Sequence, residues 1–147
     1  MRLPAIRPGY TFFAVSVFLS AFLLFAIQPI ASKHLLPYFG GSSAVWATSL
    51  VFFTTILFLG YTYVYLVTSL QSRTQMIIHG SVIALATMVT AFAIASWGSI
   101  YPPLDWITGS TLAPALRVLV ALALSVGVPY FLLSTTGPLL QYWYGVT

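Results

Sequence analysis

Four long apolar runs constrain this chain of 147 residues more than any other feature of its sequence. They cover roughly residues 10–31, 44–67, 76–97 and 112–133. A helix of about 20 apolar residues crosses the hydrocarbon core of a bilayer, where only helices and closed barrels satisfy their own backbone groups. We therefore predict an all-α fold in which residues 1–147 form a single membrane domain, a polytopic transmembrane bundle of four helices followed by a C-terminal interfacial segment, 134–147.

The first apolar run is too long for a secretory signal peptide. A signal peptide has an apolar region of about 7–15 residues and a small-residue cleavage site. The run from Tyr10 to Ala31 is longer and leads directly into further apolar segments. We expect it to be retained as the first span.

The scarcity of charge excludes several classes of function. Only 4% of the residues are charged, against about 25% in a typical soluble domain. The five basic residues are scattered singly, so they form no patch for a nucleic acid, and we expect the lipid bilayer as the surrounding partner and no nucleic acid. The chain has no cysteine, which excludes disulfides and thiolate metal sites.

The basic residues also predict an orientation. Under the four-span topology Arg2, Arg7 and Arg73 lie on one side of the membrane, and Lys33 and Arg117 lie on the other. Basic residues are enriched on the cytoplasmic side. We therefore predict a multi-pass protein of the bacterial inner (cytoplasmic) membrane with both termini in the cytoplasm.

The connection between the first two runs is predicted to be a shaped turn. It contains Pro29, Pro37, Gly40 and Gly41. Proline fixes φ and removes a backbone donor, and glycine accepts positive φ, so we expect an ordered turn followed by a helix capped by a serine. Gln28 stands at the start of this turn, and we expect its amide to bond the backbone of residues 36–41.

The few polar side chains at the outer side form a candidate polar cluster of Gln28, Lys33, His34, Asp105 and Arg117. Asp105 can pair with Arg117 or Lys33, and the alternative is that each basic chain extends separately to the lipid headgroups. His34 and His79 fall at opposite membrane faces, so they cannot share one metal or haem. We predict no catalytic residue, no metal site and no cofactor, and we leave bound lipids or pigments open.

Two further patterns concern helix packing. Gly127 and Pro129 predict a kink near the inner end of the fourth helix, since Pro129 removes one helical hydrogen bond. Thr87, Ala91, Ala95 and Ser99 recur every fourth residue in the third run. Such ladders of small residues are usually surfaces on which transmembrane helices pack.

Two blocks of the sequence carry a resemblance to a known family. The first block comprises Gln28, Pro29, Lys33, Leu35, Leu36, Pro37, Gly40, Gly41, Ser42, Ala44, Val45 and Trp46, with Ser43 in place of the family's usual proline. It continues with Leu50, Phe52, Phe53, Gly60 and Tyr61, and the second block runs from Pro129 to Trp143. Together they resemble the N-terminal membrane domain of fused spermidine synthase-like (polyamine aminopropyltransferase-like) multi-pass proteins.

The resemblance implies a membrane module and nothing about transfer chemistry. Proteins of this family carry a Rossmann-like aminopropyltransferase domain after their membrane helices, and the 147 residues hold only the membrane part. We expect a non-catalytic integral membrane subunit, an accessory or scaffolding component of a larger complex with other membrane protein subunits. The alternatives are half of a transporter-like module and a membrane anchor for a separately encoded spermidine synthase-like transferase.

Overall fold

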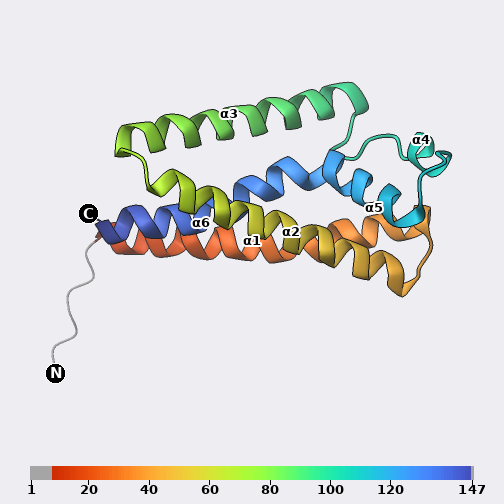
Figure 1. Cartoon of the computed structure of the whole chain (residues 1–147), viewed down its shortest axis with the longest axis horizontal. Helices are drawn as coiled ribbons and strands as arrows, with labels where there is room; N and C mark the ends of the chain where they lie inside the picture. The colour runs from red at the N-terminus through yellow and green to blue at the C-terminus, as the bar shows by residue number, and fades with distance from the viewer. Residues whose placement is uncertain (1–7, 147) are drawn as a thin grey trace.

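The computed structural model describes residues 8–146, and these form an all-α bundle, as predicted (Figure 1). The elements are α1 (Pro8–Phe39), α2 (Ser43–Thr68), α3 (Ser72–Trp97), α4 (Asp105–Thr108), α5 (Pro114–Leu122), the π-helical η1 (Ala123–Gly127) and α6 (Val128–Val146). The segments α5, η1 and α6 follow one another without a break and together make the fourth long helix.

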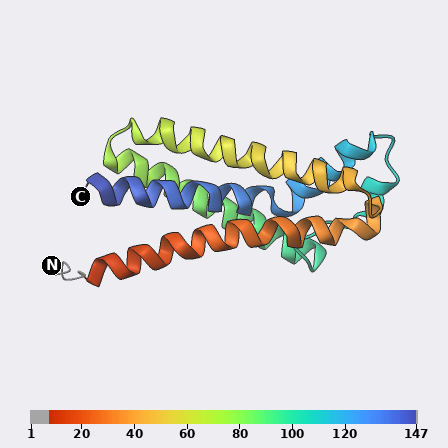
Figure 2. The same ribbon diagram turned by 90° about the horizontal axis from the view of Figure 1, so that it is seen from below.

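Four of these helices are long and apolar enough to cross a membrane. They are Thr11–Phe39, Ser43–Thr68, Ser72–Trp97 and Pro114–Gly145. Successive spans run in opposite directions, so the start of α1, the turn between α2 and α3 and the end of α6 lie at one end of the molecule (Figures 1 and 2). We call this the inner end and the opposite end the outer end. Arg2 and Arg7, two of the residues behind the predicted orientation, lie outside the described residues.

The first helix is longer than predicted and contains both prolines of the expected turn. α1 continues through Pro29 and Pro37 to Phe39, and only residues 40–42 separate it from α2. A proline costs a helix one hydrogen bond, whereas breaking the helix in lipid would expose several backbone groups. The predicted shaped turn is therefore confined to its glycine end, where Gly40 has a φ of +84° and Gly41 is not left-handed. Ser42 caps α2 by position but makes no side-chain cap hydrogen bond.

The fourth helix is also longer than predicted. The segment expected to lie at the interface from residue 134 onward is the second half of α6, which is helical to Val146 and includes Pro138. The irregularity expected near Pro129 is present as the π-helical η1, directly before α6, and the chain changes direction there (Figure 1). Because the helix continues to the inner end, this irregularity lies near the middle of the span and not at its inner end.

The main hydrophobic core joins α1, α2, α4, α5, η1 and α6. Its fully buried members include Leu35, Ile107, Leu122 and Tyr130. α3 contributes no residue to this core among the described residues and packs mainly against α6, with a smaller contact to α2. Figure 1 shows α3 standing apart from α1. The molecule is thus a compact three-helix unit with a fourth helix attached at its side.

Candidate functional site

Gln28 forms a hydrogen bond between α1 and α6. Its Nε2 atom donates to the hydroxyl oxygen of Tyr130 over 2.8 Å. Tyr130 is fully buried, and the two residues are 102 positions apart in the sequence. The predicted bond from Gln28 to the backbone of residues 36–41 is therefore wrong: α1 remains helical through Phe39, and the Gln28 amide bonds Tyr130 of α6 instead.

We expect Gln28→Leu to weaken the contact between α1 and α6 by about 0.6–1.7 kcal/mol, the range measured for single interhelical hydrogen bonds in membranes. The substitution leaves the buried Tyr130 hydroxyl without its donor. Unfolding of the purified protein in detergent by added sodium dodecyl sulfate measures this loss. Tyr130→Phe removes the other partner, so the double variant should cost less than the sum of the two single variants. Strictly additive losses would show that the bond contributes nothing.

The remaining members of the predicted outer cluster lie near the outer end but do not form ion pairs. Lys33 is exposed, and neither Lys33 nor Arg117 is bridged to Asp105 in the described part of the chain. Arg117 instead donates from Nε to the carbonyl oxygen of Leu112 and from a terminal nitrogen to that of Thr108, both over 2.7 Å. Its role is to hold the loop between α4 and α5, because free carbonyl groups there satisfy the guanidinium without a carboxylate.

The loop that follows α3 is an ordered cap on the bundle. Leu104 and Ile107 insert into the main core at 4% and 1% exposure. The His34 ring of α1 stacks on Tyr101 of the loop, with ring centroids 3.7 Å apart. Burial raises the pKa of Tyr101, so its phenol stays neutral against the histidine. Arg117 and His34 thus hold the outer loop, and no hydrogen bond or ion pair joins the described members of the predicted outer cluster to one another.

A second polar cluster, at the inner end, was missed by the sequence reasoning. Gln75 is buried and accepts a 2.7 Å hydrogen bond at Oε1 from Nε1 of Trp143, while its Nε2 donates to the carbonyl of Leu70 over 2.8 Å. His79, one turn further along α3, is also buried and lies beside Trp143. Residues 75 and 79 share a helix face, which the sequence could have indicated, but the third apolar run was expected to begin only at residue 76.

This inner cluster attaches α3 to the rest of the bundle. The Tyr63 hydroxyl oxygen of α2 lies 3.4 Å from Nδ1 of His79, and Trp143 belongs to α6. His79 and His34 lie at opposite ends of the molecule, and the described residues contain no group of three metal-ligating side chains. The cluster therefore supports a clamp between helices more directly than a metal site.

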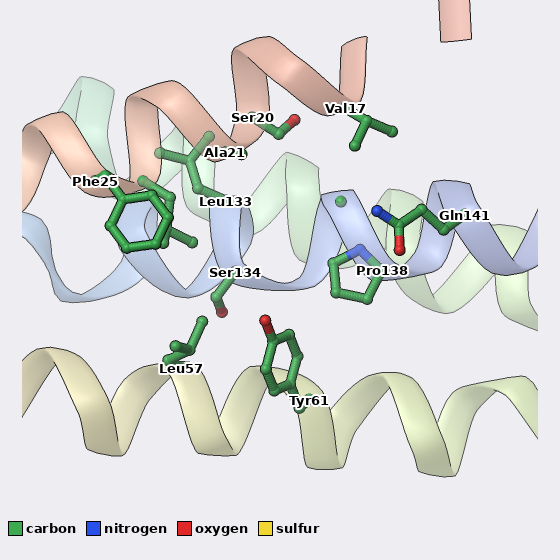
Figure 3. A pocket seen from close by; sticks show the side chains of 12 residues that line it. Val17, Ser20, Ala21, Phe25, Leu57, Tyr61, Leu133, Ser134, Pro138 and Gln141 are labelled. Atoms are coloured by element: carbon green, nitrogen blue, oxygen red, sulfur yellow. The ribbon is translucent and has the colours of Figure 1, made fainter. Parts of the chain in front are cut away.

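A cavity of about 160 Å³ lies among α1, α2 and α6 in the inner half of the bundle. Its walls are mostly apolar, and Leu57, Leu133 and Phe25 are among the lining residues. Figure 3 shows four polar side chains around the same space, namely Ser20, Tyr61, Ser134 and Gln141. None of the twelve lining residues is ionisable near neutral pH, so the few polar groups of this mostly apolar cavity are all neutral.

One close approach shapes the wall of this cavity. Gly60 of α2 lies against Ser134 of α6, and a Cβ atom built on Gly60 would overlap the Ser134 hydroxyl oxygen and lie 2.9 Å from its Cβ. Gly60 is required there because no other residue leaves room for α6. This contact sets the spacing of α2 and α6 beside Tyr61.

The fold and these contacts define a multi-pass α-helical integral membrane protein in contact with the lipid bilayer. In comparisons with known proteins, no family model, no curated protein and no solved structure matches the chain. What the protein does must therefore be inferred from its helices, its cavity and its exposed faces.

Proposed function

We propose that the protein is a non-catalytic accessory or scaffolding subunit that binds another membrane protein through α3. The observation that supports this proposal is a stripe of small residues on α3, which we call the small face: Gly80, Ala84, Thr87, Ala91 and Ala95. All five are exposed, and they lie on the side of α3 opposite to the buried Gln75, His79, Ala86 and Ala93.

The small face has the composition of a helix-packing surface, yet it is exposed in the described part of the chain. A Cβ atom added to Gly80 would meet no atom within 4 Å. Lipid provides no hydrophobic drive for helix association, so transmembrane helices associate through small residues that permit close backbone approach. Large side chains flank the stripe, among them Ile83 on one side and Met88 on the other. A transmembrane helix of a partner subunit would fit between them.

Bulky substitutions on the small face should dissociate a partner without unfolding the chain. We expect Ala84→Leu with Ala91→Leu to reduce co-purification of a membrane partner in mild detergent at least tenfold, because the leucines prevent close helix approach. Leu85→Met, at an exposed position of α3 outside the small face, is the matched control and should leave co-purification unchanged. The chain's own unfolding in detergent should be the same for all three proteins.

Cysteine cross-linking tests the same surface independently. The chain has no cysteine, so Ala84→Cys introduces a single reactive thiol on the small face, and Phe58→Cys introduces one on an exposed face of α2. Cross-linking of native membranes should join a second protein to the first variant and not to the second. Recovery of the wild-type chain as a stable monomer with no associated protein would contradict the accessory role.

A transporter-like module is the second candidate function. Its specific support is the combination of η1 in the middle of the fourth span with prolines inside α1 and α6, because interrupted helices are common at transporter binding sites. Apart from tyrosines, the ionisable groups of the described spans are Lys33, His34, Arg73, His79 and Arg117, and none of these lines the cavity. Uptake of a labelled polyamine into proteoliposomes, lost in Lys33→Ala, would favour this candidate.

The family resemblance suggests a further arrangement and a location. A spermidine synthase-like membrane domain could anchor a separately encoded transferase, and the two matching sequence blocks are its support. A pull-down that recovers no Rossmann-type partner would argue against the anchor. We also propose a bacterial inner membrane with the inner end in the cytoplasm, which a reporter fused after residue 147 tests directly.

A further inference from the structure

Three polar side chains border the cavity of α1, α2 and α6, and they are open to an entering ligand: Tyr61 is 53% exposed, Gln141 is exposed and Ser20 is half-buried. Ser20, Tyr61 and Gln141 come from three different helices, and none of them has a hydrogen-bond partner among the described residues. Figure 3 shows the Tyr61 hydroxyl and the Gln141 amide directed toward the space between the helices. Three donors from three helices therefore border one cavity.

Neighbouring serines of α1 make a helical hydrogen bond that Ser20 lacks. On α1, Ser16 donates to the carbonyl oxygen of Phe12 over 2.9 Å and Ser32 donates to that of Gln28 over 2.7 Å. Ser20 lies between them on the same helix and makes no such bond. Ser134, the fourth polar residue, already donates to the carbonyl of Phe131, which leaves its oxygen as an acceptor.

The donors define the charge and chemistry of a suitable ligand. An unpaired charge at membrane depth is costly, and the cavity has no ionisable partner for an ammonium, carboxylate or phosphate group. A neutral head avoids this cost. The hydroxyl and amide groups can donate to oxygen acceptors such as carbonyl groups, and the apolar walls favour an apolar body around them.

The size of the cavity and its access from the lipid further restrict which ligands fit. A cavity of about 160 Å³ is close to the roughly 150 Å³ that accommodates one benzene ring. The cavity is open on one side, and Phe25, one of its walls, is 66% exposed. A ligand can therefore enter from the lipid and leave its tail there.

We infer that this cavity binds the head of a neutral, lipid-soluble ligand, one ring in size and carrying carbonyl oxygens, the chemistry of a membrane quinone. Tyr61, Ser20 and Gln141 donate to the ring oxygens, and Phe25, Leu57 and Leu133 contact its apolar parts. The site is one of binding only, and it is independent of whether α3 binds a partner subunit, because none of the lining residues belongs to α3.

The test is equilibrium binding of a radiolabelled benzoquinone with a decyl chain to the full chain in lipid nanodiscs. We expect saturable binding of one molecule per chain. Decylbenzene has the same ring and chain without oxygens and should compete at least tenfold more weakly. Decanoate and decyltrimethylammonium carry charged heads and should compete no better than decylbenzene. Tyr61→Phe and Ser20→Ala should each weaken binding of the quinone about 3- to 10-fold, the value of one hydrogen bond.

Matched variants separate a binding site from a general effect on the helices. Tyr65→Phe removes a hydroxyl from an exposed tyrosine one turn along α2, and Ser16→Ala removes one from a serine that is already bonded. Both should leave binding unchanged. Absence of saturable binding, equal competition by decylbenzene, or no effect of Tyr61→Phe and Ser20→Ala would overturn the inference.

Discussion

Phe53→Ala should destabilise the bundle by about 3–5 kcal/mol, the largest loss expected of any substitution considered. Phe53 is 2% exposed, and its ring lies 4.8 Å from that of Tyr130 and 5.3 Å from that of Phe52. Truncation leaves a cavity at the contact of α2 with α6 and removes its dispersion contacts. Because lipid offers no hydrophobic drive between helices, packing of this kind is the main source of stability. Unfolding in mixed micelles with sodium dodecyl sulfate measures the loss.

Phe58→Ala is the matched control on the same helix. Phe58 is 68% exposed and faces lipid in the folded bundle. Its side chain remains in contact with lipid or detergent when the helices separate, so its removal should change the free energy of unfolding by less than about 0.5 kcal/mol. Equal losses for the two phenylalanines would show that general hydrophobicity, and not packing between α2 and α6, stabilises the fold.

Gly60→Ala should cost about 1–3 kcal/mol, the usual penalty for overpacking a filled interior. The added methyl group would overlap the Ser134 hydroxyl and forces α2 away from α6. The same unfolding assay measures the effect. Gly80→Ala on α3 is its control, since a Cβ there meets nothing within 4 Å, and this change should be neutral or stabilise by up to about 1 kcal/mol through helix propensity.

A second substitution at the contact identifies its physical cause. Ser134→Gly removes both atoms that crowd the new methyl group. In that background Gly60→Ala should cost less than about 0.5 kcal/mol, so the two substitutions should be strongly non-additive. A penalty that persists in the double variant would mean that Gly60 is needed for a reason other than the approach of α6.

The number and position of the spans followed from the sequence because hydropathy acts locally. Each apolar run near 20 residues must become a helix in lipid whatever its neighbours are, so the all-α class and four spans were predicted correctly. Helix ends were predicted less well. Pro29, Pro37 and Pro138 were assigned to turns or to an interfacial segment, yet all three lie inside helices.

The candidate site depended on contacts that no local pattern discloses. Gln28 was correctly singled out as a polar residue that needs a partner, but its partner, Tyr130, lies 102 residues away on another helix. The clamp of Gln75 with Trp143 and the cavity beside Tyr61 likewise join residues from separate spans. These pairings depend on which faces of the helices meet and on how far the helices are shifted along one another.

The sequence alone therefore determined that this protein lies in a lipid bilayer, that it is helical and that few charges lie within its spans. Each of these is a property of single segments. Tertiary structure alone decided that α3 stands outside the main core, that its small face is exposed, and that three donors border one neutral cavity. The physical reason is that helix association in a bilayer rests on close steric fit, as between Gly60 and Ser134, and such fit exists only once the helices are placed together.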